Sequence, residues 1–115
     1  MEQPAVFAHI AIARLDVAEA WYTALMGRAP DSRPGYNIME WHQKDQGRLQ
    51  LLEDRDRAGS GTMTLRVVDL AAERRRIVEA GIRAGKVEQT PGAPHLRVVD
   101  PSGNLVVLES SAGLE

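Results

Sequence analysis

Three absences narrow what this chain of 115 residues can do. It contains no cysteine, which excludes disulfides, thiolate metal sites and cysteine nucleophiles, and makes the cytoplasm the expected compartment. Neither sign of charge dominates, because 14 Lys and Arg stand against 16 Asp and Glu. The chain therefore has no basic footprint for nucleic acid and no polybasic patch for a membrane surface. Its opening stretch, "MEQPAVFAHIAIA", has no basic residues and no apolar block, so we expect neither a signal peptide nor a membrane span.

Familiar catalytic motifs are missing as well. The sequence contains no G-x-S-x-G elbow, no phosphate-binding P-loop and no H-E-x-x-H. The serines fall in expected turns or near the C-terminus, without patterned histidine and acid partners. The dense cationic run Arg74–Arg76 is interpreted as the solvated face of a helix.

Residues 5–27 predict a strand followed by a helix. The strand is rich in β-forming residues up to Ile12, and the helix begins at Leu15 and Asp16. Glu19 follows Asp16 at the spacing of a capping box. An apolar stripe at helical spacing is expected to face the core, and it consists of Val17, Trp21 and Leu25. Gly27 supplies the helix stop.

Residues 61–81 repeat this plan. A strand runs to Val67 or Val68, Asp69 is the expected N-cap, and Gly81 ends the helix. The apolar stripe of this second helix consists of Leu70, Ile77 and Val78. Ile12 and Leu15 superpose on Val67 and Leu70 with the same spacing, which indicates an internal duplication.

Short strand-like segments separated by turn-formers complete each half. They are residues 28–33, 36–42 and 48–53 in the first half, and 85–90, 95–99 and 104–109 in the second. The turn-formers between them include "RPG", "KDQG", "PGAP" and "DPSG". We predict one α+β domain over residues 1–115, with module one at about 5–53, a linker at about 54–61 and module two at about 62–110.

These motifs resemble the vicinal-oxygen-chelate superfamily. The aromatic pair Trp21-Tyr22 and the pair Met26-Gly27 are similar to its first module, and "DPSGN", residues 100–104, is similar to the most specific signature of its second. The superfamily includes glyoxalase I, extradiol dioxygenases, fosfomycin-modifying enzymes and metal-free bleomycin-resistance proteins. The resemblance implies two tandem βαβββ modules that form a curled mixed sheet around a concave cleft, and a homodimer as the common assembly.

The resemblance also implies four metal-ligand positions, which fall on Phe7, Gln50, Thr62 and Val107. Only Gln50 can coordinate a divalent ion well, and Phe7 and Val107 cannot coordinate at all. No metal cofactor is therefore expected. An alternative stays open, in which His9 and Glu109, each two residues beyond an expected position, rebuild a site with Gln50 or His42.

Strand alternation separates a helix-covered face from a cleft face without reference to the family. The apolar positions expected under the helices are Ile10, Ile12, Leu49, Leu51, Met63, Leu65, Val67, Leu96, Val98, Val106 and Leu108. The alternate positions, which include His9, Gln50, Thr62, Arg97 and Glu109, face the cleft. For residues 36–42 the sequence does not decide which face the helix covers. If Met39 and Trp41 lie under the helix, Glu40 and His42 face the cleft, and the reverse assignment is also open.

The sequence thus predicts a protein that binds a small organic molecule without a metal. The candidate ligand-binding residues are His9, Glu40, His42, Gln50, Thr62, Arg97 and Glu109. Arg48, Arg66 and Arg97 on the cleft face favour an anionic or neutral ligand. One alternative is a glyoxalase-like lyase or isomerase, which acts through a shifted metal site or through His9, Glu40 or His42 as acid or base. Another alternative is a regulatory module with a filled cleft.

Overall fold

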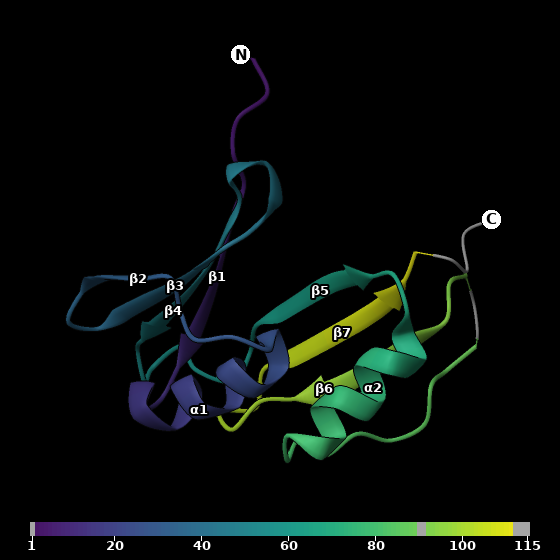
Figure 1. Ribbon diagram of the computed structural model, residues 1–115. Helices are drawn as coiled ribbons and strands as arrows, with labels where there is room; N and C mark the ends of the chain where they lie inside the picture. The colour runs from purple at the N-terminus through teal and green to yellow at the C-terminus, as the bar shows by residue number, and fades with distance from the viewer. Residues whose placement is uncertain (1, 90–91, 112–115) are drawn as a thin grey trace.

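The computed structural model describes residues 2–89 and 92–111 and contains two helices and seven strands (Figure 1). In chain order the elements are β1 (Phe7–Ile12), α1 (Leu15–Met26), β2 (Ser32–Gly35), β3 (Ile38–His42), the 3₁₀ turn η1 (Lys44–Gln46), β4 (Arg48–Glu53), β5 (Thr62–Val67), α2 (Leu70–Glu79), β6 (His95–Val99) and β7 (Leu105–Ser110). In this part of the chain, no helix is long and apolar enough to cross a lipid bilayer.

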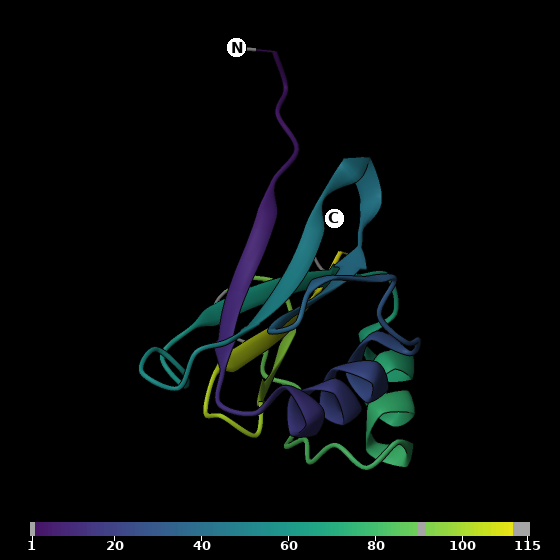
Figure 2. The same ribbon diagram turned by 90° about the vertical axis from the view of Figure 1, so that its left-hand side faces the viewer.

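The strands form two sheets that repeat one pattern. The first has the order β1-β4-β3-β2, and the second has the order β5-β7-β6. In each, the strand before the helix pairs parallel with the last strand, and the hairpin strands pair antiparallel. Helix α1 packs on β4, α2 packs on β6 and β7, and the two helices lie next to each other (Figures 1 and 2). The predicted α+β class with duplicated modules is confirmed. Both sheets are open rather than closed on themselves.

Burial confirms which strand faces the helices cover. The predicted inward residues of β1, β4, β6 and β7 are all buried, and Met63 is buried on β5, whereas Leu65 and Val67 pack at the edge of the core. The helix stripes are only partly right. Leu25 is buried as predicted, but Val17 and Val78 are 41% and 42% exposed. Helix α1 buries Ala18 and Tyr22 in place of Val17 and Trp21. The two sets share the same periodicity, so spacing alone did not distinguish them.

Two strand predictions differ from the structure. The first hairpin strand is β2 at Ser32–Gly35, and the chain turns at Tyr36 and Asn37 rather than at "RPG". Pro34 is accommodated because β2 is an edge strand. In the second module, the described part of residues 85–90 contains only one bridge, Glu88 to His95, rather than a strand; Thr90 lies outside the described residues.

The "DPSGN" turn is a structural clamp between the modules. The buried Asp100 carboxylate accepts a hydrogen bond from the Tyr22 hydroxyl on α1 at 2.7 Å. The buried Asn104 amide donates to the Ala11 carbonyl at 2.8 Å, and its oxygen accepts from the backbone N–H of Gly61 at 2.8 Å. A buried polar group needs such partners, so the most specific motif in the sequence serves the fold.

Candidate functional site

A polar row crosses the open face of the first sheet. His9 on β1 is the register partner of Gln50 on β4, Gln50 is the partner of Glu40 on β3, and Glu40 is the partner of Ser32 on β2. Met39 and Trp41 are buried under the helices, which settles the open choice for residues 36–42 and places Glu40 and His42 on the open face.

Glu40 is the centre of this row. Its side chain is only 2% exposed because neighbouring side chains cover it. Its carboxylate accepts hydrogen bonds from Gln50, from Ser32 at 2.8 Å and from Arg48 at 2.6 Å, and His42 Nε2 lies 3.2 Å away. Burial by itself raises the pKa of Glu40, but these hydrogen bonds outweigh it and lower the pKa from 4.5 to about 2. At neutral pH Glu40 is therefore a fixed anion and a weak general base.

Arg48 connects this carboxylate to an aromatic ring. Its guanidinium carbon lies 5.3 Å from the centroid of the Phe7 ring, within cation–π range. Phe7, Arg48 and His42 line a pocket of about 280 Å³ together with Ala5 and the β3–β4 turn. Sequence reasoning treated Phe7 only as a lost metal-ligand position. The Phe7–Arg48 contact depends on the parallel register of β1 and β4, which no local signal reports.

A second pocket lies farther along the same two strands, β1 and β4. It measures about 230 Å³, and His9, Ala11 and Leu52 of the open face form one side of it. The inter-module linker forms the other side through Asp54, Arg57, Ser60 and Gly61. Sequence reasoning identified this segment only as a linker, because its contact with β1 and β4 is a tertiary feature.

The remaining candidates lie on the second sheet. Thr62 is exposed on β5, and Glu109 on β7 accepts hydrogen bonds from Arg66 at 3.1 and 3.0 Å. Arg97 donates to Glu88 at 3.0 Å and lowers the pKa of that carboxyl. The structure thus brings His9, Glu40, His42 and Gln50 together and leaves Thr62, Arg97 and Glu109 apart from them.

Ion pairing also changes the charge argument drawn from the sequence. Each of the three arginines expected to favour an anion has a glutamate partner: Arg48 pairs with Glu40, Arg66 with Glu109 and Arg97 with Glu88. Their charges are balanced locally, so these three side chains do not by themselves select an anionic ligand.

The donor set does not fit a divalent ion. Phe7 and Val107 carry no ligand atom, and Gln50 Nε2 donates a hydrogen bond to Glu40. The four positions therefore offer only one amide oxygen, from Gln50, and one hydroxyl oxygen, from Thr62. In the shifted set, His9 and Glu109 lie on different sheets, and the Glu109 carboxylate is paired with Arg66. Over residues 2–89 and 92–111, no three His, Asp or Glu side chains are grouped as a metal site would require.

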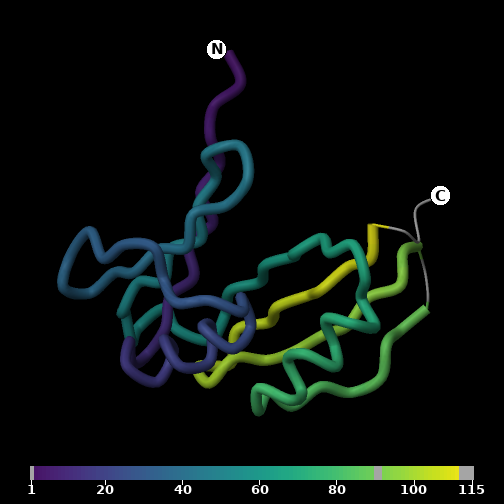
Figure 3. The backbone as a smooth tube through the Cα atoms, in the orientation of Figure 1, coloured from purple at the N-terminus to yellow at the C-terminus, as the bar shows by residue number. Residues whose placement is uncertain are grey.

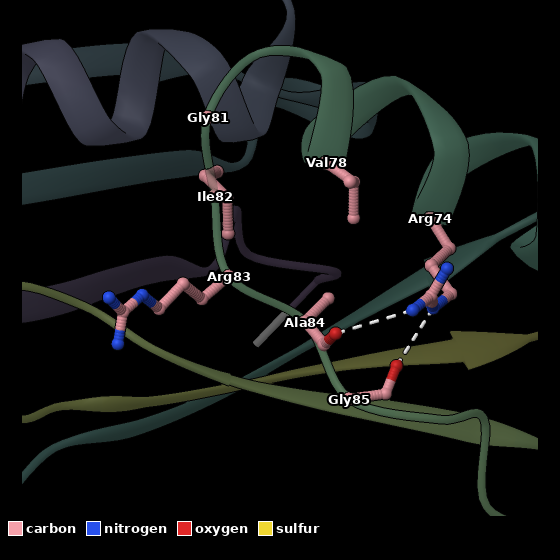
Figure 4. A pocket seen from close by; sticks show the side chains of 7 residues that line it. All are labelled: Arg74, Val78, Gly81, Ile82, Arg83, Ala84 and Gly85. Carbon is pink, nitrogen blue, oxygen red and sulfur yellow. Dashed lines mark hydrogen bonds between the residues drawn. The ribbon is translucent and has the colours of Figure 1, made fainter.

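A larger hollow lies away from the polar row. It measures about 660 Å³ and is lined by the end of α2 and the loop that follows it (Figure 4). Arg74 donates hydrogen bonds to the carbonyls of Ala84 and Gly85 there, so its guanidinium holds the loop. None of the predicted site residues lines this hollow.

Solved structures resemble the chain over almost its full length, although no family model and no curated protein matches it. A glyoxalase/bleomycin resistance protein from Catenulispora Acidiphila DSM 44928 is 28% identical with a TM-score of 0.86, and the match covers 94% of this chain and 98% of that one. A bleomycin-binding protein complexed with bleomycin is 24% identical, with a TM-score of 0.75 and coverage of 95% and 98%. Lactoylglutathione lyase from Agrobacterium tumefaciens is 17% identical, with a TM-score of 0.76 and coverage of 95% and 94%. Binding proteins and an enzyme share this fold, so the fold alone does not select a function.

Proposed function

We propose that this chain, a small member of the vicinal-oxygen-chelate superfamily by its fold, binds a small organic molecule on the open face of its first sheet without a metal and without transforming it. The observation that most strongly supports this proposal is the cluster of Ser32, His42, Arg48 and Gln50 around the Glu40 carboxylate. A carboxylate fixed by hydrogen bonds from its neighbours holds Arg48 against Phe7. This produces a rigid site with an aromatic surface and hydrogen-bond donors, a common composition for small-molecule pockets.

Two further observations support binding over catalysis. Of the four positions at which the resemblance implies metal ligands, Phe7 and Val107 carry no ligand atom, and only Gln50 and Thr62 could donate one, which is too few for the Lewis-acid chemistry of the metal-dependent enzymes. Glu40, whose pKa is about 2, is a poor acceptor of substrate protons at neutral pH. The similarity to a bleomycin-binding protein supports an organic ligand.

We also propose a cytoplasmic homodimer. The absence of cysteine is the support for the compartment. Exposed apolar side chains support the assembly, since Val6 and Val99 are 75% and 60% exposed. A homodimer is also the common assembly of the family that the sequence resembles.

Thermal shift with bleomycin as the probe tests the binding proposal. At one hundred times its dissociation constant a ligand adds about 2.7 kcal/mol, which raises Tm by several degrees in a domain of this size. We expect Arg48→Gln and Phe7→Ala to reduce the shift, because both alter the pocket. Tyr36→Ala, at an exposed turn outside the pocket, should retain it. Equal shifts in all four proteins would contradict this location.

The alternative is a lyase with a rebuilt metal site. The feature that favours it is the His9 ring, which makes no hydrogen bond to residues 2–89 or 92–111. We expect Zn²⁺, Ni²⁺, Mn²⁺, Fe²⁺ and Co²⁺ to leave the Tm of metal-stripped protein unchanged. A metal-dependent shift that disappears in both His9→Ala and Glu109→Ala, together with formation of lactoylglutathione, would establish the enzyme reading instead.

A further inference from the structure

We propose that the inter-module linker selects the ligand, with Arg57 and His9 binding a carboxylate group at one end of the molecule. This inference rests on the proposed function and concerns the same open face of the first sheet. It assigns a role to residues 54–61, which otherwise only connect the two modules.

The two pockets are lined by residues that alternate along β1. Phe7 lines the first and His9 lines the second, and alternate residues of a strand are about 7 Å apart on the same face. The second pocket, at about 230 Å³, is smaller than the roughly 300 Å³ at which drug-sized sites begin. It therefore suits one end group of a molecule whose remainder lies against Phe7 and Arg48.

The linker wall of this pocket is already formed without ligand. The Asn104 side-chain oxygen accepts hydrogen bonds from Gly59 N at 3.1 Å and Gly61 N at 2.8 Å. Asp54 N donates to the Ile12 carbonyl at 2.9 Å, which fixes the start of the linker to β1. Gly59 has φ +95°, and a Cβ there would lie 2.5 Å from the Ser102 carbonyl oxygen. Because the wall is held in place, little ordering entropy is lost on binding.

Arg57 differs from the other arginines of the open faces. Its side chain is 84% exposed, and its Nε lies 3.9 Å from Asp54 Oδ2, which is too long for a hydrogen bond. Arg57 and Asp54 therefore form a loose ion pair without a hydrogen bond at Nε. Arg48, Arg66 and Arg97, by contrast, donate to a glutamate at 2.6 to 3.1 Å.

The chemistry of the pocket favours a singly charged oxygen acid. A guanidinium binds a carboxylate through two parallel N–H···O bonds, and the His9 ring, which makes no hydrogen bond within the described part of the chain, can add a third donor. Ala11 and Leu52 supply an apolar side for the carbon next to the carboxylate. The negative charge of Asp54 beside Arg57 disfavours a doubly charged anion such as a phosphate monoester.

An NMR titration tests this selection with three probes that share one ring. Phenylacetate, phenylacetamide and phenethylamine present a carboxylate, a neutral amide and a cation, respectively. We expect phenylacetate to shift the backbone amide signals of His9 and residues 54–61 saturably and to bind more tightly than the other two. Arg57→Gln should weaken phenylacetate about tenfold or more, as expected for a charged bidentate contact. Arg55→Gln is the matched control, since Arg55 is exposed on the same linker and does not line the pocket.

The outcomes separate this inference from the proposed function. If phenylacetate shifts only the signals around Phe7 and Arg48, or if Arg57→Gln and Arg55→Gln act alike, the linker does not select the ligand but the site stands. Preference for phenethylamine would overturn the inference in the same way. If no probe shifts any signal of the first sheet, the carboxylate inference fails, and the bleomycin experiment decides the proposed function independently.

Discussion

At the scale of the residue, Glu40 shows how an ionised group can lie inside a face that is otherwise open. Strand alternation turns Met39 and Trp41 toward the helices, so Glu40 must point the other way. There, side chains from β2, β3 and β4 surround its carboxylate. Without those donors, burial would favour the protonated form.

The pH dependence of stability tests this role of Glu40. The pKa of Glu40 is lowered from 4.5 to about 2 in the folded protein, so its stabilisation is present above pH 4.5 and is lost as the pH falls toward 2. The shift corresponds to at most about 3 kcal/mol. We expect Glu40→Gln to be less stable than the wild type in urea at pH 7, by a difference that shrinks below pH 4.5.

The exposed Glu2→Gln provides a matched control. It should follow the wild type at every pH, because its carboxylate has no such surroundings. A stability difference between wild type and Glu40→Gln that stays constant from pH 7 to pH 2 would contradict the assignment.

At the scale of the element, the two helices are stabilised in different ways. Helix α2 has a local N-cap, because Asp69 accepts from Ala72 N at 3.0 Å. Helix α1 has no side-chain N-cap of its own. The capping box expected from Asp16 and Glu19 does not form, since Asp16 pairs with Arg14 and Glu19 with Arg33.

Distant residues satisfy both ends of α1 instead. The Glu53 carboxylate on β4 accepts from Leu15 N at 2.9 Å. At the other end, Arg76 of α2 donates to the carbonyls of Ala24 at 2.8 Å and of Leu25. The interpretation of Arg74–Arg76 as a solvated face was therefore wrong for Arg76 and for Arg74, which binds the loop after α2. The positive charge of Arg76 also suits a helix C-terminus.

Removal of this cap should destabilise the fold. Arg76→Met keeps much of the apolar stem and deletes the donors, so we expect a loss of about 1–3 kcal/mol in the free energy of unfolding by urea. Arg75→Met, at the neighbouring exposed position, should stay within about 0.5 kcal/mol of the wild type. Equal losses in the two variants would show that the contact with α1 contributes nothing.

At the scale of the whole molecule, the two modules are joined on one side and open on the other. The clamp of Tyr22, Asp100 and Asn104 holds them together. The second sheet leaves Val99 exposed on its open face. Residues 2–6, which precede β1, extend away from the rest of the chain (Figure 3). These surfaces support the proposed homodimer.

Sedimentation equilibrium checks that assembly. We expect the wild type to have a mass of twice 12.6 kDa. Val99→Asp should lower the measured mass toward that of a single chain, because a buried unpaired carboxylate is costly at an interface. Val78→Asp introduces the same charge on α2, at the helical side of the molecule, and should leave the mass unchanged. A wild-type mass of one chain would overturn the homodimer.

The sequence by itself determined the features that depend on neighbours along the chain. Alternation placed Ile10 and Ile12 inward, the repeat predicted two modules, Asp69 marked a helix start, and Gly27 marked a stop through its left-handed conformation, φ 76°. Backbone sterics, turn chemistry and periodicity act over a few residues, so they can be interpreted without the fold.

Only the tertiary structure decided which side chains meet. It paired Glu109 with Arg66 instead of His9, brought Arg48 to Glu40 and Phe7, and set the linker against β1 and β4. The buried stripe of α1 also depends on tertiary contacts, because the Tyr22 hydroxyl donates a hydrogen bond to Asp100, 78 residues away. These contacts depend on strand order, register and helix rotation, which follow from packing of the whole chain rather than from any local stretch.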